Sequence, residues 1–281
     1  MRFLVCIFIV TGCLGFVGQE PCELLYDGNG DGSVGSADLV ALLGEYGLSC
    51  ALSVGFSCGD TLDYQGSAYL TVEIGGHCWF AQNLRSEAYR NGDPILANLS
   101  DSDWQNAGEG AVAVFGEDGG CQSLSPDINA CDPEQSLEAY GRLYNGFAVT
   151  DERGVCPAGW HVSSDGDWMD MEIALGMTEE ETSSTGARGT DQAEQLKASN
   201  GWYNDGQGTN TSGFTAAPGS FRSANGYFSA GGAYAWFWTS TPAGEGTEVY
   251  TREFDWNPFV KRNENGVCCS GYSVRCVLDP G

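Results

Sequence analysis

The stretch Y-L-T-V-E-I-G-G-H-C-W-F-A-Q-N-L-R, residues 69–85, begins with an alternation of apolar and polar residues at 69–74 that is typical of a β-strand. From Ser57 onward the chain continues in short aromatic and β-branched runs separated by glycine-rich turns, and 41 of its 281 residues are glycine. This texture predicts a loop-rich domain of the α+β class that is tied together by disulfides.

Similar patterns predict the other regular elements. Further strands are expected at 235–241, 248–255 and 271–278. One helix is expected over 164–175, where Ser and Asp are suitable N-cap residues, and a second over about 191–198.

The net charge of the chain limits the classes of molecule that it can bind. The chain has 12 Lys and Arg residues against 38 Asp and Glu residues, which gives a net charge of −26. Such a chain is repelled by nucleic-acid phosphates and by anionic lipid surfaces, so we expect no nucleic-acid partner.

The first residues, M-R-F-L-V-C-I-F-I-V, place one positive charge before an apolar run that is too short to span a bilayer. This is typical of a secretory signal, and we expect a signal peptide at 1–18, no transmembrane segment, and a secreted or outer-surface protein. Two kinds of processing are open: lipid anchoring at Cys13, or ordinary cleavage near Gly15 or Gly18.

A calcium loop is expected shortly after this leader, in D-G-N-G-D-G-S-V-G-S-A-D. Its ligands stand at positions 1, 3, 5, 7 and 12 of the loop pattern, and Gly32 supplies the turn at position 6. These ligands are Asp27, Asn29, Asp31, Ser33 (through its carbonyl) and Asp38. Calcium is therefore the expected cofactor.

The calcium loop leads into D-L-V-A-L-L-G-E-Y-G, which has helical spacing, and together they resemble one half of a dockerin repeat. That family docks onto cohesin partners, so the resemblance implies a helical calcium-loop module at 19–50 with a cohesin-like partner. A disulfide between Cys22 and Cys50 is expected to replace the stability of the missing second repeat. The alternative is that calcium only orders this small module.

Several phrases further along resemble the Fibrobacter succinogenes major paralogous domain. They include the opening stretch, Y-G-R-L-Y-N, V-C-P-A-G-W-H-V, N-T-S-G-F-T-A-A-P-G, F-W-T-S-T and G-Y-S-V-R-C-V. The resemblance implies a domain at 58–281 with a C-type lectin-like fold, shared with formylglycine-generating enzymes, that has two helices and a small antiparallel sheet. The chain departs from the family pattern at Gln82, Gly146, where an aromatic residue is expected, and Ser163.

The even number of cysteines beyond the leader argues for disulfides in an exported chain. The resemblance implies that Cys156 pairs with Cys276. Two further pairs, Cys58 with Cys78 and Cys121 with Cys131, would each close a short loop. Cys268 and Cys269 are then left over, and three fates stay open for them: a vicinal bridge, pairing elsewhere, or free thiols.

Aromatic side chains are the candidates for ligand binding, because a flat ring can stack on the apolar face of a sugar. Trp104, Trp202 and Trp256 lie in Gly/Asn/Asp-rich surroundings and are expected at the surface. No complete calcium-dependent sugar motif is present, and D-W-N-P at 255–258 is the nearest approach to one.

The sequence therefore predicts a secreted or surface-attached bacterial protein that binds an extracellular glycan or surface protein and supports adhesion. One alternative is a display scaffold that docks to a partner through the module at 19–50. A second alternative is an enzyme related to the formylglycine oxidases. No catalytic residue is expected, because no histidine, serine or carboxylate pair is singled out for such a role.

Overall fold

A computed structural model describes residues 56–244 and 248–280 of the chain. The described residues belong to one compact unit, Phe56–Gly281. The expected signal peptide, the calcium ligands and the Cys22–Cys50 pair lie outside the described residues. Among the residues that are described, no helix is long and apolar enough to cross a membrane.

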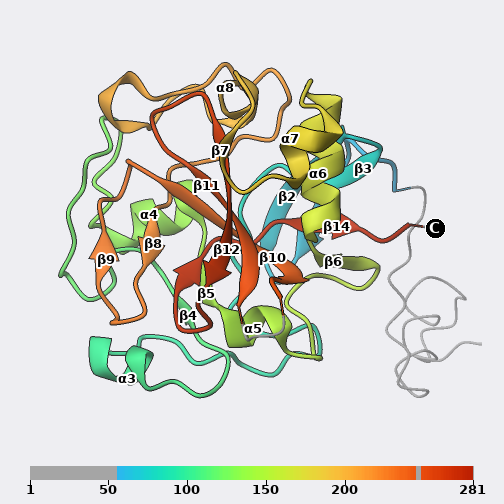
Figure 1. Cartoon of the computed structure of the whole chain (residues 1–281). Helices are drawn as coiled ribbons and strands as arrows, with labels where there is room; N and C mark the ends of the chain where they lie inside the picture. Colours follow the sequence, from blue (N-terminus) through green and yellow to red (C-terminus); the bar gives the residue numbers. More distant parts are fainter. Residues whose placement is uncertain (1–55, 245–247, 281) are drawn as a thin grey trace, which may run out of the picture. The chain divides into compact units, whose positions relative to one another are not determined.

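Three antiparallel sheets form the framework of the described unit (Figure 1). The first sheet has the order β1-β2-β3-β14-β6. Its strands are β1 (Thr61–Tyr64), β2 (Ser67–Ile74), β3 (His77–Phe80), β14 (Cys276–Leu278) and β6 (Trp160–Val162). Gly75 and Gly76 join β2 to β3 with φ of 65° and 79°, the left-handed conformation that a tight two-residue hairpin turn requires.

The second sheet has the order β10-β11-β12-β7. Its strands are β10 (Ala235–Pro242), β11 (Val249–Phe254), β12 (Val260–Gly266) and β7 (Gly186–Arg188). The third sheet has the order β4-β5-β13-β8-β9. Its strands are short: β4 (Val112–Ala113), β5 (Leu143–Asn145), β13 (Gly271–Tyr272), β8 (Phe221–Arg222) and β9 (Phe228–Ser229).

The helices are short and lie around these sheets. They are α3 (Asp101–Gln105), α4 (Pro133–Tyr140), α5 (Gly146–Thr150), α6 (Asp165–Ala174), α7 (Glu179–Ser183), α8 (Gln192–Leu196) and the 3-10 turn η1 (Tyr203–Asp205). The two helices expected from sequence exist as α6 and α8. The Ser164 side chain caps α6 in a capping box with Asp167, as expected of an N-cap residue.

The predicted α+β class, a C-type lectin-like domain with two helices and one small sheet, is wrong. The described unit is mostly β, with three antiparallel sheets and several short helices. The prediction failed because strands of two or three residues carry no readable alternation, so the third sheet left no pattern in the sequence.

The predicted final strand at 271–278 is also two strands rather than one. β13 belongs to the third sheet and β14 to the first, and the chain crosses between them at Ser273–Arg275. Ser273 exchanges backbone hydrogen bonds with Trp236 and Trp238 of β10 during this crossing. The end of the chain therefore links all three sheets.

The three expected disulfides of this unit are formed. Cys58–Cys78, Cys121–Cys131 and Cys156–Cys276 are bonded, and the last joins residues 120 apart in sequence. Cys156 and Cys276 are fully buried in the core. Cys268 and Cys269 are free thiols, so of the three fates left open the structure has this one.

Candidate functional site

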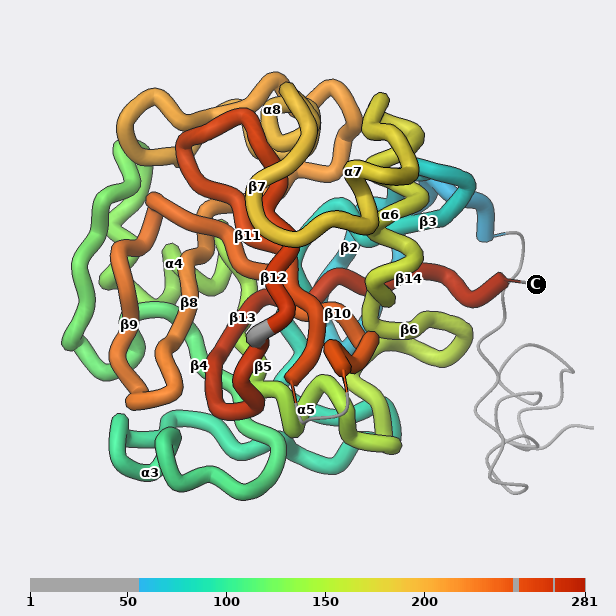
Figure 2. Tube along the Cα trace, viewed as in Figure 1, coloured from blue at the N-terminus to red at the C-terminus, as the bar shows by residue number. Residues whose placement is uncertain are grey.

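A cavity of about 330 Å³ lies between two chain segments, 124–127 and 199–207, which Figure 2 traces in green and in amber to orange. Its wall is rich in hydrogen-bonding groups. They come from Asp127, Ser199, Asn200, Tyr203, Asp205 and Gln207. The wall therefore mixes polar and apolar groups, and it includes two aromatic residues, Trp202 and Tyr203.

Hydrogen bonds donated by backbone N–H groups hold the segment 199–207 in place. The Gly201 N–H donates to Asp127 Oδ2 at 2.6 Å, which ties one wall to the other. The Tyr203 N–H donates to the Gly232 carbonyl at 2.7 Å. Asn204 and Asp205 both adopt a left-handed conformation, with φ of 55° and 54°, and these residue types tolerate it best after glycine. The cavity is thus set on a defined turn.

Two exposed aromatic residues lie close to this turn: Tyr203 is part of it, and Trp256 is on the loop between β11 and β12 that packs against it. Tyr203 is 43% exposed and Trp256 is 45% exposed. Gly206 brings them together, because a Cβ at Gly206 would lie 2.8 Å from the Trp256 Cα, so the two backbones are in direct contact. The ring of Trp256 also lies 5.8 Å from the ring of Tyr234.

A buried lysine fixes the loop that carries Trp256. The Lys197 ammonium donates to the carbonyls of Asp255 and Asn257, at 3.0 and 3.1 Å, on either side of Trp256. Burial lowers the pKa of Lys197 to about 8, an effect that Asp255 opposes. The Asp255 carboxylate in turn accepts from the Asn257 N–H at 2.7 Å. Trp256 is therefore presented on a rigid support.

The other two tryptophans proposed as ligand contacts are not at the surface. Trp104 and Trp202 are each 1% exposed, and the surface expectation is wrong for both. Trp104 donates from Nε1 to the Cys269 carbonyl at 2.8 Å, and Trp202 donates to the Ala216 carbonyl at 3.2 Å. In the sequence G-W-Y-N-D-G it is the next residue, Tyr203, that faces solvent, and polar surroundings alone do not reveal which of two neighbouring aromatics turns outward.

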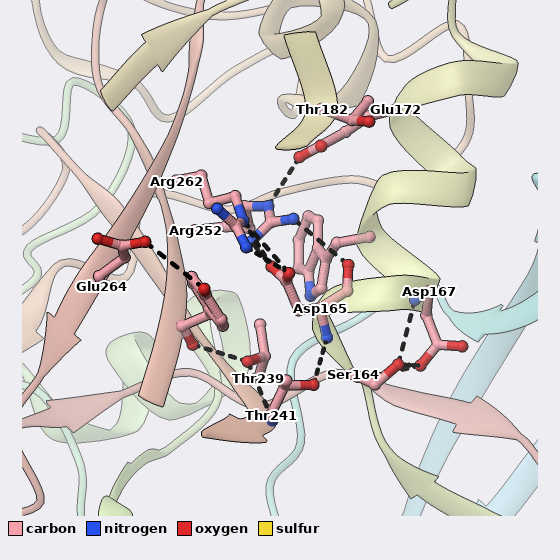
Figure 3. Close-up of polar contacts among 12 residues, drawn as sticks. Ser164, Asp165, Asp167, Glu172, Thr182, Thr239, Thr241, Arg252, Arg262 and Glu264 are labelled. Carbon is pink, nitrogen blue, oxygen red and sulfur yellow. Dashed lines mark hydrogen bonds and ion pairs between the residues drawn. The ribbon is translucent and has the colours of Figure 1, made fainter. Parts of the chain in front are cut away.

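A cluster of buried charges joins α6 to the second sheet (Figure 3). Glu172 accepts from Arg188 and Arg252, both at 2.7 Å. Asp165 accepts from Arg252 at 2.6 Å and from Arg262 at 2.8 Å. Burial lowers the pKa of Arg188 to about 10 against the opposing pull of Glu172. These side chains are at most 8% exposed, and each one forms an ion pair with another member of the cluster. The cluster therefore has a structural role.

Both histidines of the chain lie beside the start of α6. His161 contacts Asp279 at 2.7 Å and Asp167 at 3.0 Å. His77 contacts Asp170 at 2.9 Å and approaches Asp167 at 3.6 Å. The hydrogen bond with Asp167 raises the pKa of His161, with a further contribution from Asp279. No group of three or more His, Cys, Asp or Glu residues within 56–244 and 248–280 has the arrangement of a metal site.

Comparison with known proteins identifies one family. The family model described as the Fibrobacter succinogenes major domain matches residues 72–278. No curated protein and no solved structure matches the chain. The match covers well over half of the 281 residues, from β2 to the end of β14. The chain therefore belongs to the family of the Fibrobacter succinogenes major domain.

Proposed function

We propose that this protein is a non-catalytic binding protein for an extracellular polysaccharide, and that the cavity beside Tyr203 and Trp256 is its binding site. The observation that carries the proposal is a cavity with polar groups in its wall, with the exposed Tyr203 in that wall and the exposed Trp256 on the adjoining loop. A ring can stack on the apolar face of a sugar while amides and carboxylates bind its hydroxyl groups.

The charge of the site favours a neutral polysaccharide. Asp127 and Asp205 line the cavity, and no Lys or Arg of the part of the chain that the structure describes does. The net charge of −26 adds a general repulsion of acidic polymers. The cavity volume of about 330 Å³ is at the small end of the range for ligand sites, which suits a short segment of a glycan chain.

The proposal includes export and a calcium-loop module at 19–50 with Asp27, Asn29, Asp31, Ser33 and Asp38 as ligands. The loop sequence supports it, and the dockerin-like pattern favours docking to a protein partner as a second role. In that case the described unit would be the part displayed at the cell surface.

Binding of the full chain to immobilised neutral and acidic polysaccharides tests this function. We expect binding to neutral polymers, with Tyr203→Ala and Trp256→Ala each weakening it about tenfold or more, as loss of one stacked ring does. Tyr227→Ala is the matched control, because Tyr227 is 62% exposed and does not line the cavity.

Binding that both site variants leave unchanged would refute the assignment of the site, and no binding to any glycan would refute the function. Repeating the assay with a calcium chelator distinguishes the contribution of the calcium-loop module to glycan binding from that of the described unit. Loss of glycan binding in chelator would contradict a site built only from the described residues.

A further inference from the structure

A second cavity, of about 220 Å³, has a cysteine in its wall. Cys268 lines it together with the apolar side chains of Phe147, Trp238 and Val249. Glu248 adds one carboxylate. None of these residues belongs to the glycan site proposed above.

Cys268 and Cys269 occupy the two central positions of the turn between β12 and β13. The Ser270 N–H donates to the Val267 carbonyl at 2.8 Å and closes this turn. The two Sγ atoms lie 3.6 Å apart, and both thiols are partly exposed. The pair is therefore in contact and within reach of a small reagent.

Hydrogen bonds from two other segments of the unit fix the backbone carbonyls of both cysteines. The Gly146 N–H donates to the Cys268 carbonyl at 2.8 Å, and Trp104 Nε1 donates to the Cys269 carbonyl at 2.8 Å. A Cβ at Gly146 would lie 2.8 Å from the Cys268 Cα, so only glycine allows this approach.

We propose that Cys268 and Cys269 form a reversible thiol–disulfide exchange site for small, uncharged disulfides and thiols that enter through the cavity. The Cys268 thiolate attacks one sulfur of a disulfide RSSR, forms a mixed disulfide and releases RS⁻. Cys269 then loses its proton to solvent and attacks Cys268 Sγ, which closes the vicinal disulfide and releases the second RS⁻. Two thiols are oxidised and RSSR is reduced to two thiols.

Two observations assign these roles. Cys268 lines the cavity and Cys269 does not, so an incoming molecule meets Cys268 first. Burial raises the pKa of Cys269, as does its contact with Cys268, so Cys269 keeps its proton and is suited to act second.

The bridge would also be easy to reopen. Adjacent Cα atoms are only about 3.8 Å apart, shorter than the usual distance across a disulfide, and strained bonds are reduced more readily. Cys156–Cys276, in contrast, spans 5.8 Å between Cα atoms and is fully buried. Mild reduction should therefore open 268–269 first.

Mass mapping of the full chain after limited reduction and exposure to glutathione disulfide tests the proposal. We expect the peptide with both cysteines to lose two hydrogens and keep no adduct. Cys269→Ser should retain one glutathionyl group on Cys268, and Cys268→Ser should react more slowly. A lasting adduct on the unmodified chain, unreactive thiols, or a bond from Cys268 to any cysteine other than Cys269 would overturn the proposal.

The cavity is tested separately with two probes, anionic glutathione disulfide and neutral 4,4′-dithiodipyridine. We expect the neutral probe to react faster with the unmodified chain. Glu248→Gln should raise the rate of reaction with glutathione disulfide. Phe147→Ala should reduce the difference in rate between the neutral and the anionic probe. Tyr227→Ala is the control and should change neither rate. If the two probes react at equal rates with the unmodified chain and with every variant, entry through the cavity is contradicted.

Discussion

Arg275 shows how one residue can stabilise a crossing between sheets. Its side chain is fully buried and donates to the carbonyls of Phe80, Phe214 and Thr215 and to Asn83 Oδ1, at 2.6 to 2.9 Å. Its guanidinium lies 4.1 Å from the centre of the Phe214 ring. Burial lowers the pKa of Arg275 to about 9, and no carboxylate among the described residues offsets this cost.

Arg275→Met should lower the free energy of unfolding by about 3–5 kcal/mol, because several buried acceptors lose their donor at once. Urea unfolding measures this change. Arg85→Met is the control: Arg85 is partly exposed and its guanidinium donates to one carbonyl, so its loss should cost about 1 kcal/mol or less. Equal effects of the two changes would refute the role given to Arg275.

His161 should make stability depend on pH. Its folded-state pKa is raised by Asp167 and Asp279 above the usual value of about 6.5, so the folded state binds its proton more tightly than the unfolded state. This contribution is complete below the unfolded pKa and is lost as pH rises through the raised folded-state pKa.

The difference in unfolding free energy between the unmodified chain and His161→Gln should therefore be largest near pH 5–6 and shrink above about pH 7. Urea unfolding at several pH values measures it. A difference that does not change over this range would contradict the linkage.

At the scale of elements, α6 is joined to its sheet by charge as well as by apolar packing. Trp168 packs against Trp79, Phe214, Phe237 and Phe254 on one side. Asp165 and Glu172, one near each end of the helix, bind three arginines of β7, β11 and β12. The helix is thus fixed in register with the sheet at two points.

Glu172→Gln should destabilise the fold by about 3–5 kcal/mol, because Arg188 and Arg252 would share a neutral partner in a buried site. Thermal and urea unfolding measure the loss. Glu180→Gln, on an exposed position of α7, is the control and should change stability by less than about 0.5 kcal/mol. A small effect at Glu172 would mean that water enters the cluster.

At the scale of the whole described unit, Cys156–Cys276 ties the segment before β6 to β14, the strand that lies between β3 and β6 in the first sheet. A disulfide that closes a loop of 120 residues restricts the unfolded chain more than a disulfide that closes a loop of 10 residues. Replacing both Cys156 and Cys276 by Ala should cost about 5 kcal/mol, against about 3 kcal/mol for Cys121 and Cys131. Urea midpoints compare the two variants, and the reverse order would refute the loop-length argument.

Local patterns allowed part of this molecule to be predicted. The alternation at 69–74 lies within β2, the runs at 235–241 and 248–255 match β10 and β11, and the Ser164 cap starts α6. The sheet arrangement could not be predicted, because β14 pairs with β3 across almost the whole described chain. Trp202 and Tyr203 show the same limit at the site, since burial depends on what a distant segment covers.

The place of β14 also sets the order in which the protein can be completed during synthesis. Val277 pairs with Trp79 on one side and with His161 on the other, so β3 and β6 meet only through the last strand. At the usual rates of translation, Trp79 waits roughly 10–40 s for its partner to be made. A nascent chain therefore cannot close its first sheet before residues 276–278 have been made, and a product that ends before Cys276 would be a target for proteolysis.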